Sequence, residues 1–140
     1  MKLTRRNMLI TSSASAVAVA MGAFPAFASV TDEEIAKITG GAALAEGAIT
    51  IDAPEIAENG NTVPIGVDAP GAVAVTLFAD GNPLPNVATF NFGPLSASRS
   101  ASTRIRLAKT QNVIAIAKME DGTFQKASAN VKVTIGGCGG

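Results

Sequence analysis

Val73-Ala74-Val75-Thr76-Leu77-Phe78-Ala79 is the most continuous apolar run of the chain, and Asp80-Gly81 ends it with a turn signal. A run of this length that is rich in β-branched and aromatic residues is typical of a buried β-strand. A second run of the same kind, Val113–Ala117, follows later in the sequence. The two runs predict central strands around which the other segments are arranged.

Shorter segments with alternating apolar and polar residues lie on both sides of these runs. Upstream, Ile49 and Ile51 alternate with polar residues, and so does Thr62–Asp68, where Pro64 lacks an N–H and indicates an edge position or a bulge. The downstream segments are Val87–Phe92, Ser98–Leu107 and Thr123–Ile135. The chain is therefore predicted to form an all-β, immunoglobulin-like β-sandwich of about seven strands.

A short helix is predicted ahead of the sandwich. Thr31-Asp32-Glu33-Glu34 has the form of a capping box, in which the first and last residues bond each other's backbone. Ile35 and Ile38 continue on one helical face, and Gly40-Gly41 ends the pattern. We expect this helix to run from about residue 31 to residue 39.

The first 28 residues have the organisation of an export signal. Arg5 and Arg6 stand in a motif similar to the twin-arginine signal, an uncharged run follows, and Ala26-Phe27-Ala28 is an A-x-A cleavage site. The uncharged run is only weakly apolar, so a cleaved signal is favoured over a membrane anchor. We expect export to a bacterial periplasm, cleavage after Ala28 and no membrane attachment afterwards.

The chain ends in Gly136-Gly137-Cys138-Gly139-Gly140, which contains its only cysteine. Glycine adopts both signs of φ with ease, so these glycines predict a flexible arm. A single cysteine can form no internal disulfide, even in an oxidising compartment. The segment therefore predicts an accessible thiol whose chemistry other proteins perform, and the alternative is a frayed, glycine-rich chain end.

The composition excludes many enzymes. The sequence has no His, Trp or Tyr, so imidazole bases, His-ligated metals and Cys-His dyads are absent. We expect no catalytic residue, no metal and no cofactor, and hence a protein that is not an enzyme. Without the three basic residues of the signal, eight basic residues stand against eleven acidic ones, so nucleic acid is not an expected partner.

Three further features of the sequence lead to predictions: an arginine pair, a carboxylate pair and the two apolar runs. Arg104 and Arg106 would face the same side of a strand, where they could receive an anion, although a solvated sheet face is favoured. Asp121-Gly122 is favoured as a hairpin turn over a carboxylate pair with Glu120. The two apolar runs are too apolar for a small sandwich to cover on both faces, so one sheet is expected to be buried against another β protein.

Four features together resemble the SoxY family, the sulfur-carrier subunits of the bacterial thiosulfate-oxidising Sox system. They are the C-terminal VKVTIGGCGG (131–140), the segment Asn82–Pro85, the strand Thr103–Leu107 and the twin-arginine leader, in which Met8 replaces the commoner phenylalanine. The resemblance covers essentially the whole chain. It divides the chain into a signal peptide (1–28), a helix with a β-sandwich (29–135) and a carrier arm (136–140).

The resemblance implies that Cys138 carries thiosulfate covalently, as a cysteine S-thiosulfonate formed with the haem protein SoxAX. The manganese hydrolase SoxB would then release sulfate, and a molybdenum-haem sulfane dehydrogenase, where present, would oxidise the remaining sulfur. A heterodimer with the β-sandwich subunit SoxZ is also implied, with the glycines serving as a swinging arm.

Two other classes of protein remain as alternatives. A secreted structural or adhesion module would use Cys138 only for an intermolecular disulfide. A thiol oxidoreductase would need a resolving cysteine or an activating histidine, and the sequence has neither.

Overall fold

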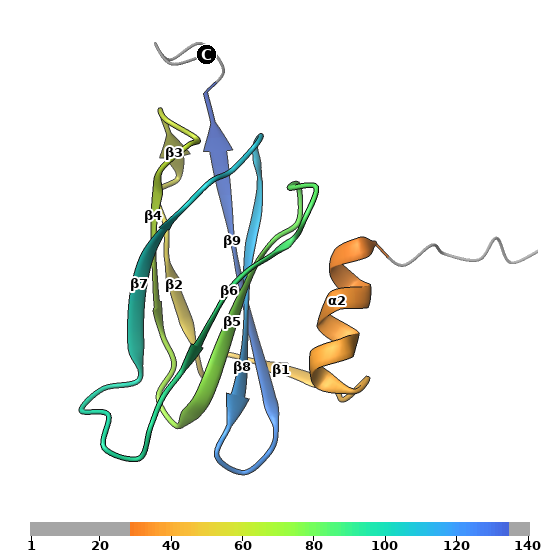
Figure 1. Cartoon of the computed structure of the whole chain (residues 1–140), viewed down its shortest axis with the longest axis vertical. Helices are drawn as coiled ribbons and strands as arrows, with labels where there is room; N and C mark the ends of the chain where they lie inside the picture. The colour runs from red at the N-terminus through yellow and green to blue at the C-terminus, as the bar shows by residue number, and fades with distance from the viewer. Residues whose placement is uncertain (1–28, 135–140) are drawn as a thin grey trace, which may run out of the picture.

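Within residues 29–134, the part of the chain that the computed structural model describes, two β-sheets pack face to face and one helix lies on the larger sheet (Figure 1). The elements are α2 (Val30–Thr39), β1 (Leu44–Glu46), β2 (Thr50–Asp52), β3 (Ile56–Ala57), β4 (Val63–Asp68), β5 (Ala72–Ala79), β6 (Asn86–Asn91), β7 (Ser100–Ile105), β8 (Gln111–Met119) and β9 (Phe124–Val133). The larger sheet has the order β1-β9-β8-β5-β6, with β3 also paired to β9, and the smaller sheet has the order β2-β4-β7.

The predicted all-β sandwich is confirmed, and the described residues form nine strands where about seven were expected. The two additional strands, β1 and β3, have three and two residues. Both pair in parallel with β9, which lies far along the chain, as the pairs Leu44 with Phe124 and Ile56 with Lys132 show. Such short segments carry too few residues for a periodic pattern, so they could not be predicted from the sequence.

The main core lies between the two sheets. Strand β4 buries every second residue, namely Val63, Ile65 and Val67, and these side chains pack against the inner faces of β5 and β8. On β5 the inward residues include Val75 and Leu77, both completely buried. This alternation is the pattern that a strand with one solvated face should have.

Helix α2 covers the outer face of the larger sheet. Ile35 packs in one cluster with Phe78 of β5, Ile114 and Ile116 of β8 and Phe124 of β9, and all five side chains are buried. Strands β5 and β8 are therefore covered on both faces within this chain. Their apolarity gives no reason to expect another β protein on this sheet, and that argument from the sequence was wrong.

The helix is capped by Ser29, two residues before the predicted position. Ser29 Oγ accepts a hydrogen bond from the Asp32 N–H at 3.1 Å, and Asp32 Oδ2 accepts one from the Ser29 N–H at 3.3 Å. The predicted box between Thr31 and Glu34 was wrong because Thr31, only 3% exposed, belongs to the buried face. A cap at Ser29 places Thr31 inside the helix, and because Ile35 follows four residues later, both side chains lie on the same helical face and face the sheet.

The rest of the buried helical face also differs from the prediction. Thr31, Ile35 and Thr39 form the buried stripe, whereas Ile38 is 39% exposed. The helix ends as expected, because Gly40 adopts the left-handed conformation with φ 63°.

Pro64 lies in the central strand of the smaller sheet. Strand β2 pairs only with residues 66–68 of β4, so at Pro64 β4 has β7 as its one neighbour in that sheet. The missing N–H of proline is tolerated there for the same reason that it is tolerated on an edge strand.

The strand directions bring several connections to one end of the sandwich (Figure 1). Strands β5, β7 and β9 end there, and β4 and β8 begin there. We call this end the arm pole and define it by residues 58–62, 80–85 and 106–110 together with Thr134, the last described residue.

Candidate functional site

The predicted attachment residue lies outside the described residues. The same holds for the other predicted site residues, which are Gly136, Gly137, Gly139 and Gly140 of the arm and Arg5 and Arg6 of the export signal, together with Cys138 itself. What the structure describes is the surface from which the chain continues towards Cys138.

The end of β9 is held from both sides. On one side the Thr134 N–H donates to the carbonyl oxygen of Ala57 at 3.1 Å, and the Lys132 N–H donates to that of Glu55 at 2.9 Å. On the other side the Val133 N–H donates to Thr110 Oγ1 at 2.9 Å. The chain therefore enters its last residues from a fixed position.

A hydrogen-bond network joins the 80–85 turn to the 106–110 loop. Asn82 Nδ2 donates to the carbonyl oxygen of Arg106 at 2.8 Å, and Asn82 Oδ1 accepts from the Ala108 N–H at 2.9 Å. Gln111, only 5% exposed, donates from Nε2 to Asn82 Oδ1 at 3.0 Å and accepts from the Gly81 N–H at 2.8 Å. Because Thr110 also bonds Val133, the network connects this turn to the end of β9.

Close backbone approaches at the arm pole require glycine at two positions. A Cβ on Gly81 would lie 2.8 Å from Gln111 Cβ, and one on Gly60 would lie 2.6 Å from the carbonyl oxygen of Leu107. The Leu107 N–H also donates to the carbonyl oxygen of Gly60 at 2.7 Å. The loops of the arm pole are thus packed directly against one another.

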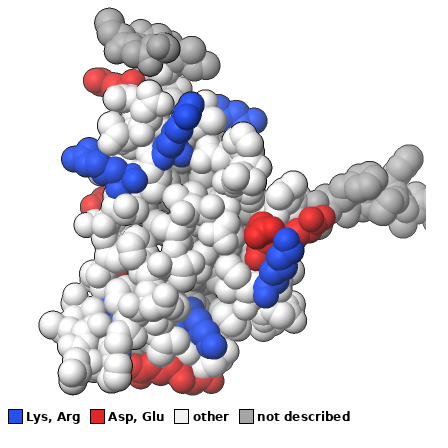
Figure 2. All heavy atoms as spheres, in the orientation of Figure 1, with Lys and Arg blue, Asp and Glu red and all other residues white. Residues whose placement is uncertain are grey.

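Basic side chains lie at and beside the arm pole. Arg106 and Lys109 belong to one of its loops, while Arg104 and Lys132 stand on the adjoining strand ends. Figure 2 shows Lys and Arg side chains towards this end of the body, with acidic side chains beside them, and a largely uncharged surface below. Among the described residues, the only ion pairs are Lys37 with Glu34 and Arg99 with Glu120, so these four cations have no carboxylate partner there.

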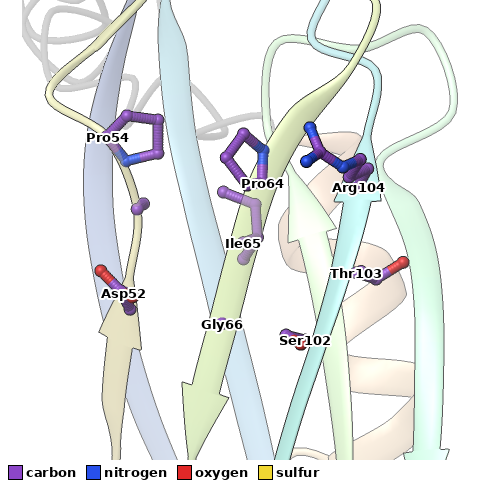
Figure 3. A pocket seen from close by; sticks show the side chains of 9 residues that line it. Asp52, Pro54, Pro64, Ile65, Gly66, Ser102, Thr103 and Arg104 are labelled. Carbon is purple, nitrogen blue, oxygen red and sulfur yellow. The ribbon is translucent and has the colours of Figure 1, made fainter.

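A shallow hollow of about 580 Å³ lies on the outer face of the smaller sheet (Figure 3). Its lining residues are Asp52, Ala53, Pro54, Pro64, Ile65, Gly66, Ser102, Thr103 and Arg104. The two charged residues, Asp52 and Arg104, stand on different strands and lie on opposite sides of the hollow. Its hydroxyl groups, those of Ser102 and Thr103, belong to β7 beside Arg104, across the hollow from Asp52.

The suspected carboxylate pair is a hairpin turn, as predicted. Asp121 Oδ1 accepts from Thr123 Oγ1 at 2.6 Å and from the Thr123 N–H at 2.9 Å. These hydrogen bonds, the hydroxyl first, lower the pKa of Asp121 below its ordinary value. Gly122 follows with φ 84°, and Glu120 pairs with Arg99 at 3.2 Å.

The described residues were also searched for a metal site and for a membrane-spanning helix. Across residues 29–134, no three His, Cys, Asp or Glu side chains come close enough together to bind a metal ion. The same residues include no helix with the length and apolarity needed to cross a membrane.

These features define a class of protein, a helix-covered β-sandwich whose last strand leads from a rigid pole to a single cysteine near the C-terminus. The family model described as "Sulfur oxidation protein SoxY" matches residues 35–138, a range that ends at Cys138. Because the match spans most of the sequence, the chain belongs to the SoxY family.

Solved structures agree with this assignment. The structure of the sulfur carrier protein SoxY from Chlorobium limicola f. thiosulfatophilum is 40% identical to this chain and has a TM-score of 0.66, over 75% of this chain and 96% of that one. A search of curated proteins finds no match.

The sandwich itself is shared with another class of protein. Superoxide reductase (neelaredoxin) from Ignicoccus hospitalis has a TM-score of 0.56 at 18% identity, over 63% of this chain and 81% of that one. A superoxide reductase from Thermotoga maritima, described as putative, has a TM-score of 0.53 at 18% identity, over 66% and 89%. At this identity the likeness concerns the fold alone.

Proposed function

We propose that this chain is a periplasmic sulfur-substrate carrier that holds thiosulfate-derived groups on Cys138 and presents them to the enzymes of a Sox system. The observation that carries the proposal is the SoxY family match, which includes both the folded body and Cys138. The related Chlorobium protein is described as a sulfur carrier, which supports the same role here.

The proposed loading step is an oxidation. The thiolate of Cys138 and the outer sulfur of thiosulfate form a disulfide bond, and two electrons leave to the haem partner, SoxAX. Hydrolysis by SoxB then adds water across the sulfur–sulfonate bond, which releases sulfate and a proton and leaves one additional sulfur on the cysteine. A sulfane dehydrogenase, where present, oxidises that sulfur.

In this proposal the chain supplies position and not catalysis. The fixed end of β9 holds Thr134, from which the chain continues towards Cys138. Four cations without a carboxylate partner among the described residues, Arg104, Arg106, Lys109 and Lys132, lie at or beside the arm pole, which also contains the acidic residues Glu58 and Asp80. A SoxZ subunit would complete the carrier as a heterodimer. Export through the twin-arginine route would bring the carrier to the periplasm, with Arg5 and Arg6 as the recognition pair.

The test compares thiosulfate oxidation by the reconstituted system with the wild-type chain and with Cys138→Ser. If the chain is a carrier, the system with Cys138→Ser should oxidise no thiosulfate, and addition of the wild-type chain should restore the oxidation. Cys138→Ser that supports oxidation at the wild-type rate would assign the cysteine to the alternative class, a structural module joined by a disulfide.

A further inference from the structure

Three glycines of the described chain follow an asparagine or an aspartate. They are Gly60 after Asn59, Gly81 after Asp80 and Gly122 after Asp121. Because glycine has no Cβ, its nitrogen can approach the side-chain carbonyl carbon of the residue before it and close a succinimide ring. The hydrogen bonds of each pair decide which of the three can react in the folded protein.

At two of the three positions the hydrogen bonds oppose this reaction. The Gly81 N–H donates to Gln111 Oε1 at 2.8 Å. The Gly122 N–H donates to the carbonyl oxygen of Met119 at 3.0 Å. A nitrogen held in this way is a weaker nucleophile, because it must lose its hydrogen bond before it can attack. A carboxylate is also ionised at neutral pH and then offers no leaving group.

Asn59 and Gly60 have the opposite properties. Asn59 is exposed, and within the described residues the Gly60 N–H donates no hydrogen bond. Asn59 Oδ1 accepts a hydrogen bond from the Asn61 N–H at 3.0 Å, which closes a small ring that contains both the Asn59 side chain and the Gly60 nitrogen. This N–H donor also stabilises the negative charge that forms on Oδ1 when the nitrogen attacks the carbonyl carbon.

We propose that Asn59 is a site of spontaneous deamidation and that isoaspartate forms there. The Gly60 nitrogen gives its proton to solvent and bonds to Cγ of Asn59, while the Cγ–Nδ2 bond breaks and the amide nitrogen takes up a proton and leaves as ammonia. Water then opens the succinimide. Opening at Cγ gives aspartate, whereas opening at the main-chain carbonyl leaves Gly60 attached through Cγ and gives isoaspartate. Water is consumed and ammonia is released, and nothing is oxidised or reduced.

The isoaspartate form disturbs the packing of Gly60. A Cβ on Gly60 would lie 2.6 Å from the carbonyl oxygen of Leu107 and 2.9 Å from Val133 Cγ1, so both neighbours stand directly against its main chain. An isoaspartyl linkage adds a methylene group to the main chain immediately before Gly60. Since closely packed sites tolerate added volume poorly, the modification weakens the contact between the 58–62 loop and the end of β9.

Asp121→Asn supplies a matched control, because it places a second Asn-Gly pair in the same kind of turn as Asn59. Oδ1 of residue 121 accepts from the Thr123 N–H at 2.9 Å, but the Gly122 N–H is held by Met119. The full chain with this substitution is incubated at neutral pH, and peptide mapping follows aspartate and isoaspartate at both positions. We expect residue 59 to react about fivefold faster than residue 121, the factor that one hydrogen bond supplies.

Incubation in concentrated urea removes the hydrogen bonds, and both positions should then react at similar rates. No reaction at residue 59 of the folded chain, or an equally fast reaction at residue 121, would overturn the proposal. A faster reaction at residue 59 that persists in urea would also refute it, because the difference would then come from the sequence and not from the fold.

The effect on the arm pole is tested on the modified protein itself. The isoaspartate form is isolated by ion exchange, and its melting temperature is compared with that of Asn59→Asp. Both carry the same additional negative charge, but the isoaspartate form alone has the longer main chain. We therefore expect a lowered melting temperature for the isoaspartate form and the wild-type value for Asn59→Asp. Equal melting temperatures would show that the longer main chain leaves the packing of Gly60 intact.

Discussion

Gly81 shows how a single residue holds the arm pole together. Its N–H donates to the buried side chain of Gln111, and the two residues approach so closely that a Cβ on Gly81 would lie 2.8 Å from Gln111 Cβ. Gln111 in turn contacts Asn82, which bonds the next loop. The absence of a side chain at Gly81 is therefore a condition for this network.

Substitution of Gly81 should lower the stability of the whole domain. We expect Gly81→Ala to cost about 1–3 kcal/mol in the free energy of unfolding, the usual range for overpacking. The control is Gly93→Ala, since a Cβ on Gly93 would meet nothing within 4 Å. Urea titration of both variants gives the comparison, and equal midpoints would show that the approach at Gly81 relaxes without cost.

At the scale of elements, helix α2 decides how the larger sheet is covered. The helix contributes Ile35 to a cluster with Phe78, Ile114, Ile116 and Phe124, on the face of the sheet that points away from the other sheet. Without the helix this apolar face would meet water or another protein. Helix and sheet therefore share one apolar cluster, although the helix precedes all the strands in the sequence.

Truncation of Ile35 tests this role. Ile35→Ala should destabilise the domain by about 2–5 kcal/mol, because it removes a buried side chain and leaves a cavity against the sheet. Ile38→Ala, at a position that is 39% exposed, should change the stability by about 1 kcal/mol or less. Thermal unfolding of both proteins checks the difference, and similar melting temperatures would mean that α2 is not packed as described.

Local patterns explain why most strands could be predicted from the sequence. The runs that became β5 and β8 and the alternation in β4 are properties of neighbouring residues, and they gave the correct type of structure. The helix cap could not be fixed in this way, since Ser29 and Thr31 are both suitable capping residues. Burial of Thr31 against the sheet decides between them, and burial depends on contacts distant in sequence.

At the scale of the whole molecule, the contacts that form the candidate site also join residues that are distant in the sequence, so local patterns could not predict them. Cys138 and its glycines were predicted as the site from the sequence alone, and they lie outside the described residues. The meeting of the loops at the arm pole had no sequence signal, because Asn82 and Gln111 are 29 positions apart and meet only when β5 and β8 pair. Pairing of distant strands brings the 80–85 turn, the 106–110 loop and the end of β9 to one end of the body.

If Cys138 holds the sulfur substrate, the mass of the protein isolated from thiosulfate-oxidising cells shows it most directly. We expect a fraction of molecules with an added thiosulfate or sulfur group, which peptide mapping places on Cys138 and which a reductant removes. The Cys138→Ser chain should carry no such group. An unmodified Cys138 in actively oxidising cells, or the same added mass on Cys138→Ser, would show that Cys138 does not hold the substrate.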